Sequence, residues 1–414
     1  MTLGKWAGVG LILAGIGLAV WAGRIALSRE PSPTAPSRQD ERLIPTGPPT
    51  GLAGPDEAVR PAPTATTRPT PTPPATANTP SETPTPAPPA AIDERPASTA
   101  THQPRPTPAG SLAAIQRFGV GVPYPPLQPD TAGQLGLGWY LTWRALETPL
   151  NLGGIEFWQM VRVGEEGYRP DAATIERIAR ANPGATWLIG NEPDVIWQDN
   201  VTPARYAELY HELYHLLKET DPAARVAIGG ITQPTPLRLQ YLEMVVSSYE
   251  SRYGQAMPVD VWNIHNFILR EERGSWGVDI PPGFEVEQGI LFELEDHDDL
   301  ERFKAQIITF RQWMADHGQR EKPLIVSEYG ILMPEDYGFP LERVKRFMYG
   351  TYDFMLNARD EQLGYPADDN RLVQRWAWYS LADDLYPTGN FIDLESGELT
   401  SLGHAHQEYI AALP

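Results

Sequence analysis

The sequence predicts an α/β protein whose last 300 or so residues form a (β/α)8 TIM barrel, preceded by an N-terminal hydrophobic segment and a disordered Pro/Thr-rich linker. Residues 111–414 hold nearly all of the aromatic residues, and their number suits one such barrel. Short apolar runs alternate there with helical patterns. This alternation implies a parallel sheet with right-handed crossovers, and eight such units close into a barrel.

Eight apolar or aromatic runs have the length and composition of buried strands. Few helical residues separate the runs near residues 120, 140 and 160, so we expect the first two units to be irregular. The predicted strands are 117–121, 138–143, 157–163, 186–190, 225–229, 259–264, 324–327 and 375–379.

Helical patterns lie between most of these strands. Thr202-Pro203 is an N-cap followed by proline at the first helical position, and Asp298 with Glu301 has the spacing of a capping box. The predicted helices are 172–181, 203–220, 237–253, 298–317, 341–358 and one near 404–412.

The first 110 residues have a different composition. Residues 6–23 form an uncharged apolar run, near the lower length limit for a membrane-spanning helix. Tryptophans near both ends favour a signal-anchor, whereas small residues before Gly23 fit a cleaved signal peptide. Residues 31–110 hold 22 of the 43 prolines, lack the apolar residues of a core, and suit either an O-glycosylated stalk or an unmodified linker.

This order predicts three parts: a signal-anchor or signal peptide (1–30), a disordered linker (31–110) and a catalytic barrel (111–414). We therefore expect the barrel to work on the extracellular face of the membrane, anchored through the N-terminal segment, or to be secreted.

The composition excludes several classes of protein. The chain has no cysteine, which removes disulfides, Cys-ligated zinc, iron–sulfur clusters and cysteine nucleophiles. Its 33 Lys and Arg against 53 Asp and Glu give a net charge of −20, which argues against nucleic-acid binding. We expect a monomer with no cofactor and no metal.

Two glutamates follow strongly apolar strands at the predicted mouth of the barrel. Glu192 follows TWLIG, and Glu328 follows PLIV. A carboxylate against apolar walls loses solvation, so stability gives no reason for this placement. Two carboxyl groups facing each other, one protonated and one ionised, are what glycoside hydrolysis requires. The alternative is that each glutamate forms a salt bridge with an arginine at the barrel rim.

The sequence resembles the large clan of (β/α)8 retaining glycoside hydrolases, and within it the cell-wall glycosyl hydrolase and β-glucanase groups. The motifs are Asn191-Glu192-Pro193 after the fourth strand and Ser327-Glu328-Tyr329-Gly330 at the seventh, and the resemblance covers most of residues 111–414. It implies a double-displacement mechanism on a β-linked polysaccharide or oligosaccharide.

Carried over residue by residue, the resemblance makes Glu192 the general acid/base and Glu328 the nucleophile. Asn191 then contacts the sugar 2-hydroxyl, and His265 closes the sixth strand near the catalytic pair. Tyr329 is expected to hold the nucleophile through its hydroxyl group, with plain packing as the alternative.

Aromatic residues supply candidate sugar-binding surfaces. Trp376 is expected to form the floor of the subsite nearest the scissile bond, with Trp378 competing for that place, and Trp143 to form an outer subsite. Each tryptophan has core packing as its alternative. Arg144 and Arg162 both remain candidates for the basic partner of the nucleophile.

A long insertion, residues 269–297, is expected to shape a cleft or lid over the active face. Its carboxylates and His297 either bind calcium or are solvated, and no calcium-loop spacing is present.

Three functions fit these motifs. The first is a retaining glycosidase. The second is a non-catalytic carbohydrate-binding barrel at the cell surface, and the third is a transglycosylase that uses the same covalent intermediate.

Overall fold

Eight parallel strands form the centre of the fold. The computed structural model describes residues 112–124 and 126–413. All eight strands predicted from the sequence are confirmed, with ends that differ by a few residues. Their bounds are Phe118–Gly121 (β1), Trp139–Leu141 (β2), Glu156–Gly164 (β3), Thr186–Ile189 (β5), Arg225–Ile228 (β6), Trp262–His265 (β7), Leu324–Tyr329 (β8) and Arg375–Trp378 (β9).

The strands form a barrel. Their order is β6-β5-β3-β2-β1-β9-β8-β7, with parallel neighbours throughout. Parallel bridges between Ala227 and Val261 and between Ile231 and Ile264 join β6 to β7 and close the circle. The sequence did not predict Gly167–Arg169 (β4), which forms an antiparallel hairpin with β3.

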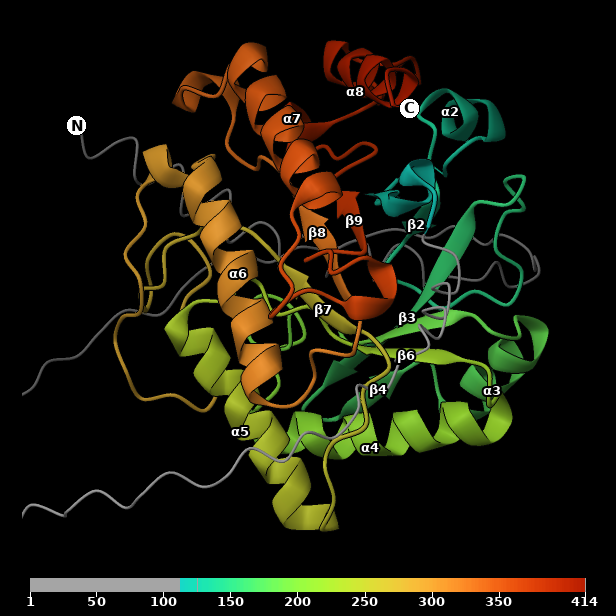
Figure 1. Ribbon diagram of the computed structural model, residues 1–414, viewed down its shortest axis with the longest axis vertical. Coiled ribbons are helices and arrows are strands. Elements are labelled where there is room, and N and C mark those ends of the chain that lie inside the picture. The colour runs from blue at the N-terminus through green and yellow to red at the C-terminus, as the bar shows by residue number, and fades with distance from the viewer. Residues whose placement is uncertain (1–111, 125, 414) are drawn as a thin grey trace, which may run out of the picture. The chain divides into compact units, whose positions relative to one another are not determined.

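Helices surround the strands on the outside (Figure 1). The six predicted helices are confirmed, and the short α2 between β1 and β2 was missed. Between β2 and β3 the described chain has no helix, as the irregular spacing there predicts. The bounds are Pro129–Gln134 (α2), Ala172–Ala181 (α3), Pro203–Thr220 (α4), Pro236–Tyr253 (α5), Leu300–Asp316 (α6), Leu341–Asn357 (α7) and Ser401–Ala411 (α8), with 3-10 turns at Ala114–Arg117, Leu294–Asp296, Glu335–Tyr337, Pro366–Asp368 and Pro387–Gly389.

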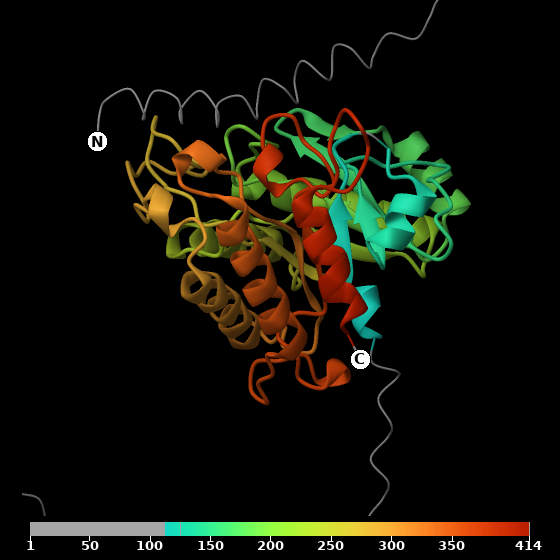
Figure 2. The ribbon, with the colours of Figure 1, turned by 90° about the horizontal axis from the view of Figure 1, so that it is seen from above.

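The two ends of the barrel chain lie side by side. Figure 2 shows the red α8 next to the cyan β1. His406 of α8 lies 2.8 Å from the carbonyl oxygen of Leu135 through its Nε2, and Phe118 packs edge-on against Trp376. These contacts and the β1–β9 pairing tie the first unit to the last.

The predicted capping box before α6 is wrong by one residue. Asp299 is the N-cap, and its carboxylate accepts the backbone N–H groups of Glu301 and Arg302. Asp298 instead forms an ion pair with Arg343. Two adjacent aspartates offer the same local cap, so the tertiary position of the arginine decides which one is used.

Strand alternation divides the interior into two cores. The outer core lies between strands and helices, and a smaller inner core fills the barrel. Trp139 and Trp158 stack in the inner core with ring centroids 4.2 Å apart. Gly119 is required beside them, because a Cβ there would lie 2.4 Å from the Trp139 indole.

The predictions for residues 1–30 and 31–110 lie outside the described residues. Within the described ranges, none of the helices combines the length and apolarity needed to cross a membrane.

Candidate active site

Glu192, His265 and Glu328 come together at the carboxyl ends of three strands. Glu192 follows β5, His265 is the last residue of β7, and Glu328 is the last residue but one of β8. The His265 Nδ1 lies 2.9 Å from Glu192 Oε1, and its Nε2 lies 3.9 Å from Glu328 Oε2. One oxygen from each carboxylate and one imidazole nitrogen lie within 4.8 Å of one another. Residues 136 positions apart in the chain therefore face each other across one imidazole.

The backbone after β5 turns sharply to direct Glu192 into the barrel mouth. Gly190 has φ of +92° and Glu192 has φ of +44°, which is a left-handed conformation that non-glycine residues rarely adopt. The Glu192 N–H donates to the Gly230 carbonyl oxygen at 3.1 Å, and the Glu192 carbonyl accepts from Val195 N–H. Such strain at a carboxylate is typical of a functional site.

A second glycine makes room for the imidazole. A Cβ at Gly230 would lie 2.4 Å from the His265 ring. This glycine follows β6, and its lack of a side chain leaves the space that the His265 ring occupies.

Trp143 contacts Glu328 directly. Its indole Nε1 donates to Glu328 Oε2 at 3.1 Å. The indole lies over Gly121, where a Cβ would come within 2.8 Å of the ring, and it meets the Tyr379 ring edge-on at 5.7 Å. Trp143 is partly exposed, so it holds Glu328 and also presents a surface to the barrel mouth.

An irregularity in β8 explains why Glu328 faces inward. Val326 and Tyr329 both pack in the outer core, although strict alternation would put residues three apart on opposite faces. The pairing with β9 shifts register between these two residues. The shift leaves the Glu328 side chain at the mouth.

Burial and charge set the protonation of this cluster. Burial raises the pKa of Glu328 to about 7, and the Glu192 charge adds to the rise, whereas His265 and the Trp143 hydrogen bond oppose it. Burial opposes a charge on His265, but the carboxylates of Glu328 and Glu192 outweigh it, so the pKa of His265 is raised. Both shifts favour a proton on Glu328 or on His265 as the pH approaches neutral.

Asn191 is anchored through its backbone. Its N–H donates to Asp199 Oδ2 at 2.7 Å, and the same carboxylate accepts from Val163 N–H and from Arg162 Nε at 2.6 Å. The buried Asn191 Oδ1 has no hydrogen-bond partner among the described residues. This unsatisfied acceptor lies one residue before Glu192.

Arg162 is the arginine whose charge acts on Glu328, and it lowers the pKa of that carboxyl. Arg144, the other candidate from the sequence, is exposed. The alternative of rim salt bridges does not apply to the two glutamates, because the only ion-pair partner of either among the described residues is His265.

Two predicted substrate-binding residues lie away from the mouth. Tyr329 is buried in the outer core, packs against Phe303 of α6, and lies 3.4 Å from Thr351 Oγ1 through its hydroxyl oxygen. Trp376 is fully buried between β9 and α7, with Phe118 and Tyr352 against its ring. This burial agrees with the alternative of plain packing for both residues.

Strand alternation gives the physical reason. The inward residue of β9 is Ala377, which belongs to the inner core, so its neighbours Trp376 and Trp378 face the helices. The sequence shows that residues alternate between two faces of the strand, but it does not show which set faces the barrel interior. Of the predicted aromatic surfaces at the site, the structure brings Trp143 to the carboxylates.

Sequence reasoning missed two tyrosines near the site. Tyr379 directly follows β9 and donates its hydroxyl to Asp383 Oδ2 at 2.6 Å. Burial raises the pKa of Tyr386, with the charges of Asp383, Glu192 and Glu328 adding to the rise, so its phenol lies within electrostatic reach of both glutamates. The signal for Tyr379 was its position at a strand end, whereas Tyr386 lies in a loop with no such mark.

Several acidic residues of the 269–297 insertion form ion pairs with arginines. Glu293 contacts Arg270 at 2.9 Å, and Asp296 contacts Arg302 at 3.0 Å. His297 is buried, and its Nε2 accepts from the Leu332 N–H at 3.0 Å. Within residues 112–124 and 126–413, the geometry for holding a metal ion occurs at Glu192, His265 and Glu328.

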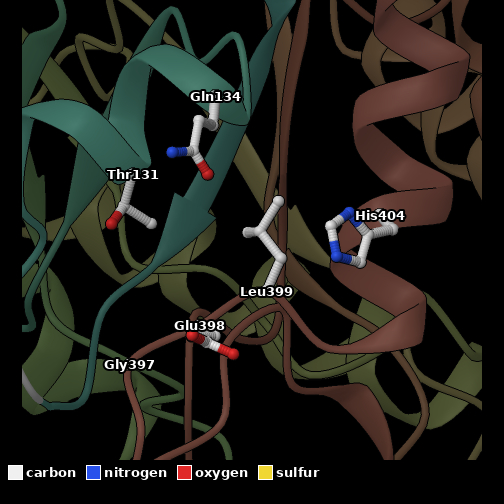
Figure 3. Close-up of a pocket in the computed structure, with 6 residues that line it drawn as sticks. All are labelled: Thr131, Gln134, Gly397, Glu398, Leu399 and His404. Atoms are coloured by element: carbon white, nitrogen blue, oxygen red, sulfur yellow. The ribbon is translucent and has the colours of Figure 1, made fainter.

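A cavity of about 340 Å³ lies elsewhere on the barrel (Figure 3). Thr131 and Gln134 of α2 line one side, and Glu398, Leu399 and His404 line the other. None of the candidate site residues contributes to it, so it is separate from the carboxylate pair.

Comparison with known proteins gives structural similarities only. No protein-family model and no curated protein matches the sequence. Similar solved structures include GH128 subgroup II endo-β-1,3-glucanases from Sorangium cellulosum and Pseudomonas viridiflava. Each is 18% identical to this chain, with a TM-score of 0.48. The first match covers 70% of this chain and 97% of the glucanase, and the second covers 72% of this chain and 98% of the glucanase.

A third similar structure is a GH128 subgroup III curdlan-specific exo-β-1,3-glucanase from Blastomyces gilchristii in complex with glucose. It is 16% identical with a TM-score of 0.48 and covers 71% of this chain and 98% of its own.

Proposed function

We propose that this protein is a retaining glycoside hydrolase that cleaves a β-linked polysaccharide or oligosaccharide. One observation carries the proposal: a carboxylate oxygen of Glu192 and one of Glu328 lie within 4.8 Å of each other at the barrel mouth. This close approach of the nearest oxygens favours the retaining class, whose two carboxyl groups lie about 5 to 5.5 Å apart, over the inverting class, whose carboxyl groups lie about 6.5 to 9.5 Å apart to fit a water molecule.

In the first step, Glu328 attacks the anomeric carbon while Glu192 donates its proton to the departing glycosidic oxygen. This gives a covalent glycosyl–enzyme and a free alcohol. In the second step, Glu192 takes a proton from water, the water oxygen attacks the same carbon, and Glu328 leaves as a carboxylate. The amide of Asn191, next to Glu192 in the chain, suits a hydrogen bond to the sugar 2-hydroxyl, which strengthens as charge develops on the ring.

The pKa of Glu328 bears on these roles. A nucleophile must be ionised, yet burial raises the pKa of this carboxyl to about 7. A raised pKa is also the property of a proton donor, so the reverse assignment is the competing one. His265 and Trp143 both favour the ionised form of Glu328, which supports the nucleophile role.

This assignment predicts the pH dependence. The wild-type kcat/KM should rise as pH increases through about 7, because Glu328 loses its proton there in the free enzyme. Trp143→Phe removes the hydrogen bond that favours the ionised form, so the acidic limb should move to higher pH. Below pH 7 we expect kcat/KM to fall roughly 10-fold or more, as for loss of a hydrogen bond to a charged group. Tyr168→Phe, at an exposed hydroxyl, should leave the pH profile unchanged.

The direct test is turnover on a panel of β-glucans, xylans and mannans. It includes laminari-oligosaccharides, which are bound in GH128 structures from Amycolatopsis mediterranei. We expect hydrolysis of at least one substrate, with the β-anomer as the first product by NMR. Binding without turnover would instead support the carbohydrate-binding barrel. Longer oligosaccharides among the products would indicate transglycosylation.

The place of action is a separate proposal. The apolar run and the Pro/Thr-rich stretch before the barrel support an enzyme held outside the cell by a stalk. Protease treatment of intact cells should release the barrel if this is correct.

A further inference from the structure

A buried arginine on α5 lies between the loop that carries Glu192 and the 269–297 insertion. Arg238, Asp194 and Glu271 all have fully buried side chains. Asp194 stands two residues after Glu192, and Glu271 lies near the start of the insertion. The ion pairs are short, with 2.6 Å from Arg238 Nη1 to Asp194 Oδ2 and 2.9 Å from Nε to Glu271 Oε1.

Every N–H of the Arg238 guanidinium has an acceptor. Nη1 donates to the Asp194 carboxylate and to the Asp194 carbonyl at 2.7 Å. Nε donates to Glu271, and Nη2 donates to the carbonyl oxygens of Val278 and Asp279 at 3.1 and 2.9 Å. Five donors meeting five acceptors is a fit that lysine cannot reproduce.

Both acidic partners fix further parts of the chain. Asp194 also accepts from the Thr232 N–H in the loop after β6, and Glu271 accepts from the Thr235 hydroxyl at 2.6 Å and the Ile290 N–H at 2.8 Å. One guanidinium therefore joins the loops after β5 and β6, the start of α5, and both ends of the insertion.

We propose that Arg238 is a positioning residue for the general acid/base. It clamps the Glu192 loop to the insertion, so that the insertion holds Glu192 in its left-handed conformation and fixes its direction toward the leaving group. The proposal rests on the role proposed above for Glu192, and it gives the insertion a task in catalysis besides that of covering the cleft.

The clamp is tested by dependence on the leaving group. A dinitrophenyl glycoside needs no proton to depart, whereas an alkyl glycoside or a polysaccharide does. In Arg238→Lys we expect kcat/KM for the poor leaving group to fall about 100-fold, as for a misplaced catalytic group. On the dinitrophenyl glycoside the assay contains azide, which attacks the glycosyl–enzyme without the help of a base. The kcat/KM of Arg238→Lys on this substrate should stay within about threefold of the wild-type value.

Arg311→Lys is the matched control. Arg311 is also fully buried, and it donates to Leu372 O, Lys322 O and Gln374. These partners lie just before β8 and β9, at the amino ends of the strands, whereas the candidate site lies at the carboxyl ends. Its replacement removes a comparable set of hydrogen bonds far from Glu192. The two substrates should therefore be affected equally, as expected for a purely structural arginine.

Hydrogen exchange separates the clamp from the proposed function. In Arg238→Lys, residues 191–199 and 269–297 should gain exchange together, and in Arg311→Lys they should not. This result without any hydrolysis by the wild type would support the structural link between the two segments, but it would reject the glycosidase and with it the catalytic task of Arg238. Equal slowing of both substrates by Arg238→Lys, or unchanged exchange in the two segments, would overturn the clamp. If Arg238→Lys does not fold, Glu271→Gln carries the same readouts, with an expected fall of about 10-fold.

Discussion

Replacing Glu328 with glutamine is expected to lower kcat for glycoside hydrolysis by about 10⁴-fold or more and to stabilise the protein at neutral pH. The loss corresponds to about 5.5 kcal/mol of transition-state stabilisation, because glutamine cannot form the glycosyl–enzyme bond. Steady-state rates on the substrate that the wild type cleaves best measure this loss.

The gain in stability follows from the direction of the pKa shift. The pKa of Glu328 rises from 4.5 to about 7 on folding, so the folded protein holds the proton more tightly than the unfolded chain. The resulting penalty on the folded state is absent below pH 4.5, grows as pH rises toward 7 and is complete above it. Glutamine removes the penalty, so Glu328→Gln should exceed the wild type by up to about 3 kcal/mol at pH 8 and by little at pH 4.

Thermal unfolding of both proteins between pH 4 and 8 measures this difference. Glu147→Gln, at an exposed ion pair with Arg177, is the control and should show neither the loss of activity nor the pH-dependent gain. A Glu328→Gln protein that is less stable than the wild type at every pH would mean that the carboxylate is held favourably and is not strained by burial.

Replacing Glu192 with alanine should lower kcat/KM by about 10²- to 10⁴-fold on substrates with poor leaving groups. The reason is that the departing oxygen then receives no proton. On a dinitrophenyl glycoside the first step should be nearly unaffected, so the glycosyl–enzyme should accumulate and give a burst.

Azide separates the roles of the two glutamates. In Glu192→Ala, azide should attack the glycosyl–enzyme and give the β-glycosyl azide, with retention of configuration. In Glu328→Ala, azide should fill the space of the lost nucleophile and give the α-azide by a single displacement. Exchanged products would assign the nucleophile to Glu192 and the acid to Glu328, in agreement with the raised pKa of Glu328.

Much of the barrel could be predicted from the sequence because its signals are local. An apolar run such as TWLI between turn residues encodes β5, and Thr202-Pro203 encodes the start of α4. The motif positions follow in turn, since parallel strands end on one face and Glu192 and Glu328 each lie at such an end.

The phase of the strands could not be predicted in the same way. Trp376 and Ala377 alternate along β9, and either phase fits the pattern RWAW. Trp139 and Trp158 already fill the barrel, so the space beside them takes Ala377, and the larger indole faces the helices. Tyr329 escaped prediction for a related reason, since the register shift in β8 depends on the pairing with β9.

The sequence by itself determined the order of strands and helices, the absence of cysteine chemistry, and the two strand ends that carry glutamates. Only the tertiary structure decided that His265 lies between those glutamates, that Trp143 holds one of them, and that Arg238 joins the loop of the other to the insertion. The physical reason is range: backbone propensity and apolar periodicity act over a few residues, whereas burial, the pKa of Glu328 and the five bonds of Arg238 depend on groups dozens to hundreds of positions apart.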